Sequence, residues 1–129
     1  MSGNALAQFA NQKYLNIETY RRDGRAVATP VWFAQSGDRL YIYCLADAGK
    51  VKRIRNNPKA RIAPCDIRGR VKGEWVDATA RLETGDGMKL GHDALNRKYG
   101  LMKRVGNFFS RLQGKKHAVI SVGVDNGAG

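Results

Sequence analysis

The residues with the clearest chemical signature are three cations, Lys50, Lys52 and Arg53, which follow the small residues Ala48-Gly49. Residues 48–55 have apolar side chains three apart, which predicts a short amphipathic helix. Cations in a first turn oppose the helix dipole unless an anion lies among them. A phosphate would bind there through backbone N–H groups and ammonium groups. Side chains that simply extend into water are the alternative interpretation.

The chain as a whole is basic, with 23 Lys and Arg against 11 Asp and Glu and a formal net charge of +12. Two segments hold much of the excess. Residues 50–72 contain nine basic residues and one acidic residue, and residues 97–116 contain seven basic residues and none acidic. A charge of this size indicates an anionic partner such as a phosphate, a nucleic acid or a membrane surface.

Motifs for protein-supplied catalysis are absent from the sequence, which has no GxSxG, no HExxH and no Walker loop. Cys44 and Cys65 are too few for a disulfide framework and are predicted to be buried, reduced thiols. His92 and His117 lack the spacing of metal ligands, so no metal site is expected. This pattern favours a domain whose bound cofactor carries the reactive atoms, and it also fits a protein that is not an enzyme.

Length and hydropathy predict one domain over residues 1–129, with an N-terminal helix in 1–12 and a frayed tail in 125–129. No run reaches the roughly 18 to 20 apolar residues that span a bilayer. The first residues have neither the basic leader nor the apolar core of a secretory signal. We therefore expect a cytoplasmic protein.

Six antiparallel strands are predicted by β-forming residues between turn signals. Asp23-Gly24 and Ser36-Gly37 supply the turn residues of two hairpins. Pro30 lies inside a predicted strand, so that strand is expected at an edge, at a bulge or beside a ligand. The predicted strands cover about 14–20, 26–34, 40–45, 60–67, 73–83 and 116–124. The fold class is mainly β, an antiparallel barrel with peripheral helices.

The helices are predicted from caps and breakers. Asn4 would cap the N-terminal helix, and Asp47 would cap the helix that Asn57-Pro58 ends. The segment 85–113 has helical composition, and Gly91, Gly100 and Gly106 predict a division into two helices.

A family resemblance covers a little over half of the chain, from about Leu15 to Glu83. The order and spacing of its pieces resemble the pyridoxamine 5'-phosphate oxidase-like proteins, and most of all their subgroup of enzymes dependent on coenzyme F420 or FMN. The pieces are Arg22-Asp23-Gly24, Ala28-Thr29-Pro30-Val31-Trp32-Phe33, Leu40-Tyr41-Ile42-Tyr43, Gly49-Lys50-Val51-Lys52-Arg53, Asn57-Pro58 and Ala63-Pro64-Cys65.

The resemblance implies a homodimeric split β-barrel of the FMN-binding type, with the cofactor in a groove at the subunit interface. It implies that Lys50 and Lys52 bind the cofactor phosphate, with Arg53 nearby. Cys44 stands where many relatives have a hydroxyl residue that contacts phosphate, and a thiol is a weaker hydrogen-bond partner. The chain also lacks the basic C-terminal tail of the true oxidases, which argues against pyridoxamine phosphate as substrate.

The resemblance further implies a set of residues beside the flavin or deazaflavin ring, namely Thr29, Pro30, Val31 and Trp32. Aromatic faces stack on conjugated rings. Trp32, Trp75, Tyr41 and Tyr43 are candidates for this role, with core packing or a dimer interface as the alternative for each. Arg68 and Arg70 are candidates for contact with an anionic cofactor tail, and solvated turn residues are the favoured interpretation.

The function expected from these observations is that of an oxidoreductase that transfers a hydride from reduced coenzyme F420 to an organic acceptor. An FMN-dependent oxidoreductase of the same fold is the nearest alternative, because FMN offers its phosphate to the same turn. The sequence also leaves open a cofactor carrier without turnover and a nucleic-acid-binding barrel. The expected partners are a second copy of the chain and a small-molecule substrate.

Overall fold

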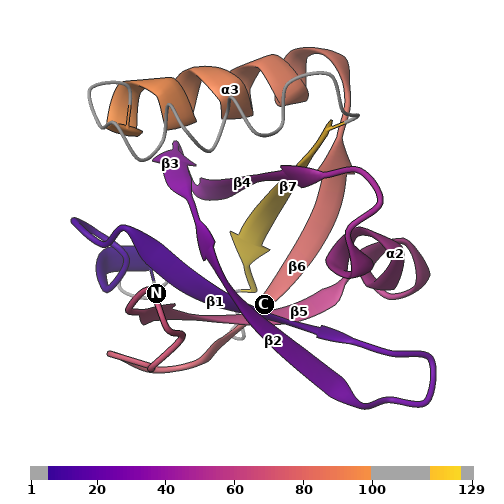
Figure 1. Cartoon of the computed structure of the whole chain (residues 1–129). Helices are drawn as coiled ribbons and strands as arrows, with labels where there is room; N and C mark the ends of the chain where they lie inside the picture. The colour runs from indigo at the N-terminus through magenta and orange to yellow at the C-terminus, as the bar shows by residue number, and fades with distance from the viewer. Residues whose placement is uncertain (1–5, 100–116, 126–129) are drawn as a thin grey trace.

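The structure is a computed structural model that describes residues 6–99 and 117–125. Within these ranges the chain forms one antiparallel sheet of seven strands, accompanied by helices α2 and α3 (Figure 1). No helix in the described ranges is long and apolar enough to cross a membrane. The elements are β1 (Tyr14–Tyr20), β2 (Ala26–Trp32), β3 (Ala34–Ser36), β4 (Arg39–Leu45), α2 (Gly49–Asn56), β5 (Lys59–Cys65), β6 (Val76–Glu83), α3 (Gly85–Tyr99) and β7 (His117–Val124).

The strand order is β2-β1-β5-β6-β7-β4-β3, so the sheet has β2 at one edge and β3 at the other. These two edge strands are nevertheless consecutive in the chain, with Phe33 alone between them. The sheet therefore has to curl until its edges meet, although they do not pair. The result confirms the predicted mainly β, split-barrel fold, and Pro30 lies on an edge strand as its missing N–H requires.

The prediction of one continuous strand over 26–34 is wrong. The structure has two strands here, β2 and β3, which are interrupted at Phe33. The Phe33 side chain is buried and packs edge to face on Phe9, with ring centroids 5.9 Å apart. Its carbonyl accepts hydrogen bonds from Tyr99 Oη at 2.6 Å and from Lys98 Nζ at 2.9 Å. The backbone at Phe33 thus bonds to α3, and the strand count rises from six to seven.

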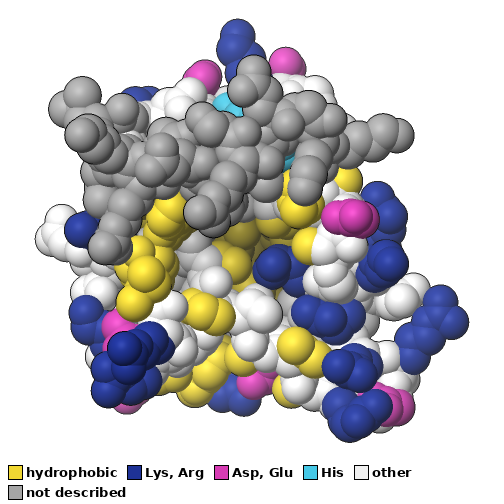
Figure 2. Space-filling view, in the orientation of Figure 1, with side chains coloured by type: hydrophobic (Ala, Val, Ile, Leu, Met, Phe, Trp, Pro, Cys, Tyr) yellow, Lys and Arg dark blue, Asp and Glu magenta, His cyan; other side chains and the backbone are white. Residues whose placement is uncertain are grey.

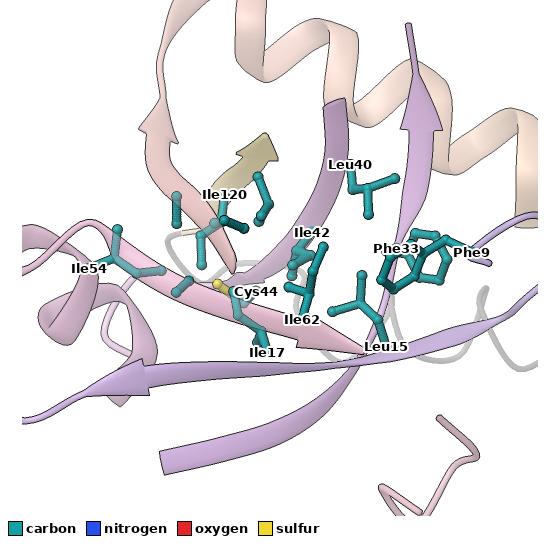
Figure 3. Packing of buried hydrophobic residues seen from close by; sticks show 14 of the residues in the cluster. Phe9, Leu15, Ile17, Phe33, Leu40, Ile42, Cys44, Ile54, Ile62 and Ile120 are labelled. Atoms are coloured by element: carbon teal, nitrogen blue, oxygen red, sulfur yellow. The ribbon is translucent and has the colours of Figure 1, made fainter. Parts of the chain in front are cut away.

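The core lies inside the curled sheet and consists of apolar side chains from nearly every strand (Figure 3). Each fully buried aliphatic side chain stabilises the fold by about 1.5 to 3 kcal/mol. Val51 and Ile54 of α2 join this core, which fixes the rotation of the helix. The residues labelled in Figure 3 are Phe9, Leu15, Ile17, Phe33, Leu40, Ile42, Cys44, Ile54, Ile62 and Ile120.

The two hairpin turns form where the sequence predicts them. Gly24 has φ 90° and Gly37 has φ 62°, a conformation that glycine adopts without steric cost. The turn before β2 is closed by Arg21, whose N–H donates to Arg25 O at 2.9 Å.

Several predicted boundaries are wrong. Helix α2 begins at Gly49 with Ala48 as its N-cap residue, so Asp47 is not the cap, and no side chain caps the helix. Strand β5 ends at Cys65 because Asp66 starts a turn. Strand β6 starts at Val76, because the N–H and C=O of Glu74 bond to the side chain of Gln8.

Helix α3 runs without interruption through Gly91, so the break predicted at that glycine is wrong. Gly91 is buried at a close crossing, where a Cβ atom would lie 2.7 Å from Val119 Cγ1 and 3.0 Å from Tyr41 Cδ2. The second predicted helix, the cap at Asn4 and most of the predicted tail lie outside the described residues. Asp125, where the tail was expected to begin, is held to β6 by its N–H, which donates to Asp77 O at 2.9 Å.

Replacing the glycine at this crossing tests the packing of α3. Gly91→Val inserts a branched side chain between Val119 and Tyr41, and we expect it to lower the free energy of unfolding by about 2 kcal/mol or more, as overpacking does. Urea unfolding provides the measurement. The matched control is Asn96→Val, which places the same residue on the exposed side of α3. Equal loss in the two variants would contradict the close crossing.

Alkaline pH tests the burial of Cys65. Burial raises the pKa of this thiol from 9.0 to about 11, and the charge of Asp66 adds to the effect. Between these values the unfolded chain releases a proton that the folded chain retains, so stability falls as pH rises. The advantage of the wild type over Cys65→Ala in urea unfolding should be full below about pH 9 and should shrink towards pH 11. A difference that is constant with pH would contradict this.

Candidate functional site

A pocket of about 430 Å³ opens where β2, β4 and the start of α2 come together at the split in the sheet. Its volume lies within the range of small-molecule sites. Figure 2 shows hydrophobic side chains exposed near the middle of this face, with Lys and Arg side chains beside them. The lining residues are Tyr14, Pro30, Val31, Trp32, Tyr43, Cys44, Leu45, Ala48, Lys50 and Ile67.

Five of the eight predicted site residues line this pocket. Pro30, Val31 and Trp32 come from the end of β2, Cys44 from the end of β4, and Lys50 from the first turn of α2. Strands β2 and β4 are far apart in the strand order and face each other here only because the sheet curls. The fold therefore gathers most of the predicted site in one place.

The other three predicted residues do not line the pocket. Thr29 lies on the same side of β2 as Val31, and its Oγ1 is buried without a hydrogen-bond partner among the described residues. Lys52 is exposed on α2. Arg53 is turned towards β1, where its Nε donates to Thr19 Oγ1 at 2.6 Å. Of the three predicted cations, only Lys50 therefore lies at the pocket.

The start of α2 forms one end of the pocket, since both Ala48 and Lys50 line it. The helix has no side-chain cap and no acidic residue in its first turn. The first N–H groups of a helix have no partner within the helix, and together they present about half a positive charge. Uncapped N–H groups beside an ammonium group are suited to hold a phosphate.

Cys44 faces this charged end. Burial raises the pKa of its thiol, and the positive charge of Lys50 lowers it by a smaller amount. The thiol is therefore neutral at pH 7, and it would not repel an anion. The lining set contains no carboxylate that would do so either.

Aromatic rings form another part of the pocket lining. The ring of Trp32 packs near both Tyr14 and Tyr99, with ring centroids 6.3 Å and 6.1 Å away. Tyr43 packs against His92 at 4.6 Å and His117 at 4.9 Å, and burial raises the pKa of its hydroxyl. Rings held by such neighbours provide a rigid surface for stacking.

Three lining residues were not singled out from the sequence, namely Tyr14, Leu45 and Ile67. Ile67 lies on the turn after β5, which Asn16 fixes by donating from Nδ2 to Gly69 O at 2.6 Å. The sequence signal that could have indicated Ile67 is a large aliphatic residue within a predicted turn beside arginines. In the structure this residue is 57% exposed.

The remaining candidates lie away from the pocket. Arg70 pairs with Asp66 at 3.0 Å, and Arg68 is exposed, which agrees with solvated turn residues. Tyr41 is buried against α3, and Trp75 is only half buried, with the Arg61 guanidinium 5.1 Å from its ring. Among the described residues no group of His, Cys, Asp and Glu side chains could hold a metal ion.

The family is established by comparison with known sequences. The model of the pyridoxamine 5'-phosphate oxidase family matches residues 1–118. The chain therefore belongs to this family. A search of curated proteins found no match.

Solved structures with the same fold have diverse roles. An F420 reductase shares 18% identity at a TM-score of 0.61, covering 93% of this chain and 92% of its own. An FAD-binding protein from Mesorhizobium loti shares 16% identity at a TM-score of 0.67, covering 98% and 89%. The haem storage protein HutZ from Vibrio cholerae shares 15% identity at a TM-score of 0.68, covering 96% and 89%. At these identities the likeness concerns the fold alone.

Proposed function

We propose that the pocket binds a flavin or deazaflavin phosphate and that the protein is an oxidoreductase, which passes a hydride from reduced coenzyme F420 to an organic acceptor. The observation that carries this proposal is that the pocket lining combines a cationic part with an aromatic part. Lys50 and the uncapped start of α2 form the cationic part, and Tyr14, Trp32 and Tyr43 form the aromatic part. A planar ring that carries a phosphate matches both parts.

The buried hydroxyl of Thr29 supports this assignment. An unpaired buried hydroxyl costs about 1 to 3 kcal/mol, and a polar ring edge laid along β2 would satisfy it. Val31, two residues further along the same side of β2, lines the pocket, so a ring edge that follows the strand from Val31 would reach the hydroxyl.

The bound cofactor would supply the hydride chemistry, and the protein would position and desolvate it. Lys50 would balance the phosphate charge, while Trp32 and Tyr43 would exclude water from the ring. The proton that an acceptor needs after hydride transfer has few sources in the lining set. They are the hydroxyls of Tyr14 and Tyr43, the Cys44 thiol and the Lys50 ammonium.

FMN is the alternative cofactor, because its terminal phosphate would make the same contacts with Lys50 and α2. Titration with each cofactor separates the two. Oxidation of the reduced cofactor in the presence of nitroaromatic, enone and quinone acceptors then separates an enzyme from a carrier.

A nucleic-acid-binding barrel would instead bind a single strand with steep salt dependence and without cofactor binding.

Single substitutions on α2 test the phosphate assignment. Lys50→Ala removes a charge-assisted contact and should weaken binding of FMN or coenzyme F420 about tenfold to a hundredfold. Fluorescence titration at fixed ionic strength measures the affinity.

Lys52→Ala is the matched control, because it removes the same charge from an exposed position two residues away. We expect it to change affinity by less than about threefold, as exposed charges do. Equal effects of the two substitutions would mean that the helix attracts the ligand by its charge alone, and full affinity in Lys50→Ala would refute the anchor.

We propose further that two copies of the chain meet over this pocket, so that the cofactor lies at the dimer interface. The support is the apolar character of its rim. Ile67 is 57% exposed, and Pro30 is exposed on the edge strand β2. A large aliphatic side chain left in water beside a pocket is typical of a surface that a partner covers.

Substitution of the rim tests the dimer. Ile67→Asp should convert the protein to a monomer in analytical ultracentrifugation and weaken cofactor binding, because a charge would be buried at the interface. Leu90→Asp is the control, since Leu90 is 43% exposed on α3 away from the pocket. A monomeric wild type, or a dimer that persists in Ile67→Asp, would overturn the proposed interface.

A further inference from the structure

A second hollow, of about 380 Å³, lies between the C-terminal end of α2 and the end of β1 with the turn that follows it. It shares no lining residue with the pocket at Lys50. Figure 2 shows Lys and Arg side chains gathered on this flank of the molecule, over α2 and the hairpin that Figure 1 labels. The lining residues are Tyr20, Arg21, Arg22, Asn56 and Asn57.

The lining set has two guanidinium groups and no carboxylate. Asp23 in the turn and Glu18 on β1 have partners of their own, and Asp77 on β6 is close enough for its charge to act on Tyr20. Asp23 accepts from Arg25 Nε at 2.8 Å and from the Arg25 N–H at 3.0 Å. Glu18 accepts from Tyr20 Oη at 2.9 Å and pairs with Arg61 at 3.5 Å. Neither Arg21 nor Arg22 forms an ion pair among the described residues, although hydrogen bonds from Arg25 and, to a smaller extent, the charge of Arg21 lower the pKa of Asp23.

A third guanidinium adds to this charge. Arg53 is half buried and bonds to Thr19 next to the hollow, and burial and then the positive charge of Arg21 lower its pKa. Arg21 and Arg53 therefore repel each other. An anion placed between such groups would convert repulsion into attraction.

Hydrogen-bond donors complete the wall. The Asn57 Oδ1 atom accepts from the Lys59 N–H at 3.1 Å, which leaves the amide Nδ2 to donate. The C-terminal end of α2 carries about half a negative charge, and this opposes an anion. The two guanidinium groups of the lining set outweigh it, and the Asn57 N–H bonds to Arg53 O, which satisfies one terminal carbonyl.

We propose that this hollow is a second anion site, which binds a phosphate or carboxylate group of a small molecule. Guanidinium groups bind both oxyanions through paired N–H donors. The size of the hollow suits one small ligand. Its only aromatic ring is Tyr20, whose hydroxyl bonds to Glu18, so the hollow lacks the stacking surfaces that a nucleic-acid strand requires.

The anion has two possible sources. It is either a separate small molecule or the far end of a ligand whose phosphate lies at Lys50. Lys50 and Asn56 are six residues apart on one helix, a rise of roughly 9 Å, so one extended ligand can reach both ends.

Calorimetric titration with pyrophosphate at low ionic strength tests the site. The wild type should bind it, and Arg21→Gln/Arg22→Gln should weaken the interaction about tenfold or more, as loss of charged hydrogen bonds does. Lys50→Gln should leave a pyrophosphate site intact. The control Lys72→Gln/Lys89→Gln removes the same net charge from exposed positions outside both hollows and should bind like the wild type.

The outcomes separate the hypotheses. Unchanged affinity in the arginine variant, or an equal loss in the lysine control, would overturn the second site. Binding of an oligothymidine strand through Arg21 and Arg22, with no pyrophosphate bound, would also overturn it in favour of nucleic acid. If the site exists, weaker binding of FMN or coenzyme F420 by the arginine variant identifies the anion as part of that ligand, and unchanged binding identifies a separate molecule. The pyrophosphate result stands even if neither cofactor binds.

Discussion

The pocket exists because a single residue, Phe33, connects the two edge strands of the sheet. With β2 at one edge and β3 at the other, a connection of one residue forces the sheet to curl until its two edges meet without pairing. The Phe33 ring is held by Phe9, and its carbonyl by the side chains of Tyr99 and Lys98. This corner brings the end of β2 opposite the end of β4, and the gap between them is the candidate site. The family to which the chain belongs shares this architecture with relatives of different function.

Electrostatics and burial give the two hollows different characters. Lys50 stands among apolar and aromatic side chains, where a charge is less screened than on an open surface, so its attraction for a phosphate is strengthened. The hollow at Arg21 and Arg22 is polar, and its attraction comes from two guanidinium groups in a lining that contains no carboxylate. Cations thus lie at both ends of α2, an eight-residue helix that separates the two hollows.

The sequence was most informative where structure is local. The turns at Gly24 and Gly37 and the helix from Gly49 to Asn56 follow from neighbouring residues, and all three were predicted. The interruption at Phe33 was not, because its cause is contact with residues distant in the sequence. The role of Gly91 was not predicted either. Its missing side chain lets α3 pack closely on β4 and β7, and these contacts are with residues distant in the sequence.

In the candidate site, too, the features set by neighbouring residues were predicted and those set by distant contacts were not. Segments that line the pocket were identified, yet Lys50 could not be distinguished from Lys52 and Arg53. That distinction depends on the rotation of α2, which the burial of Val51 and Ile54 sets. Tyr14 and Ile67 were missed because they join the pocket only through the curl of the sheet and the bond from Asn16 to the turn.

The most direct test of the central claim is a nuclear magnetic resonance titration of the isotope-labelled protein with FMN and with coenzyme F420. If the pocket holds the phosphate at the start of α2 and the ring against β2, the backbone amides of Gly49 and Lys50 and the indole N–H of Trp32 will shift most. Saturating binding that leaves these three signals unchanged, with shifts confined to other surfaces, would contradict the account.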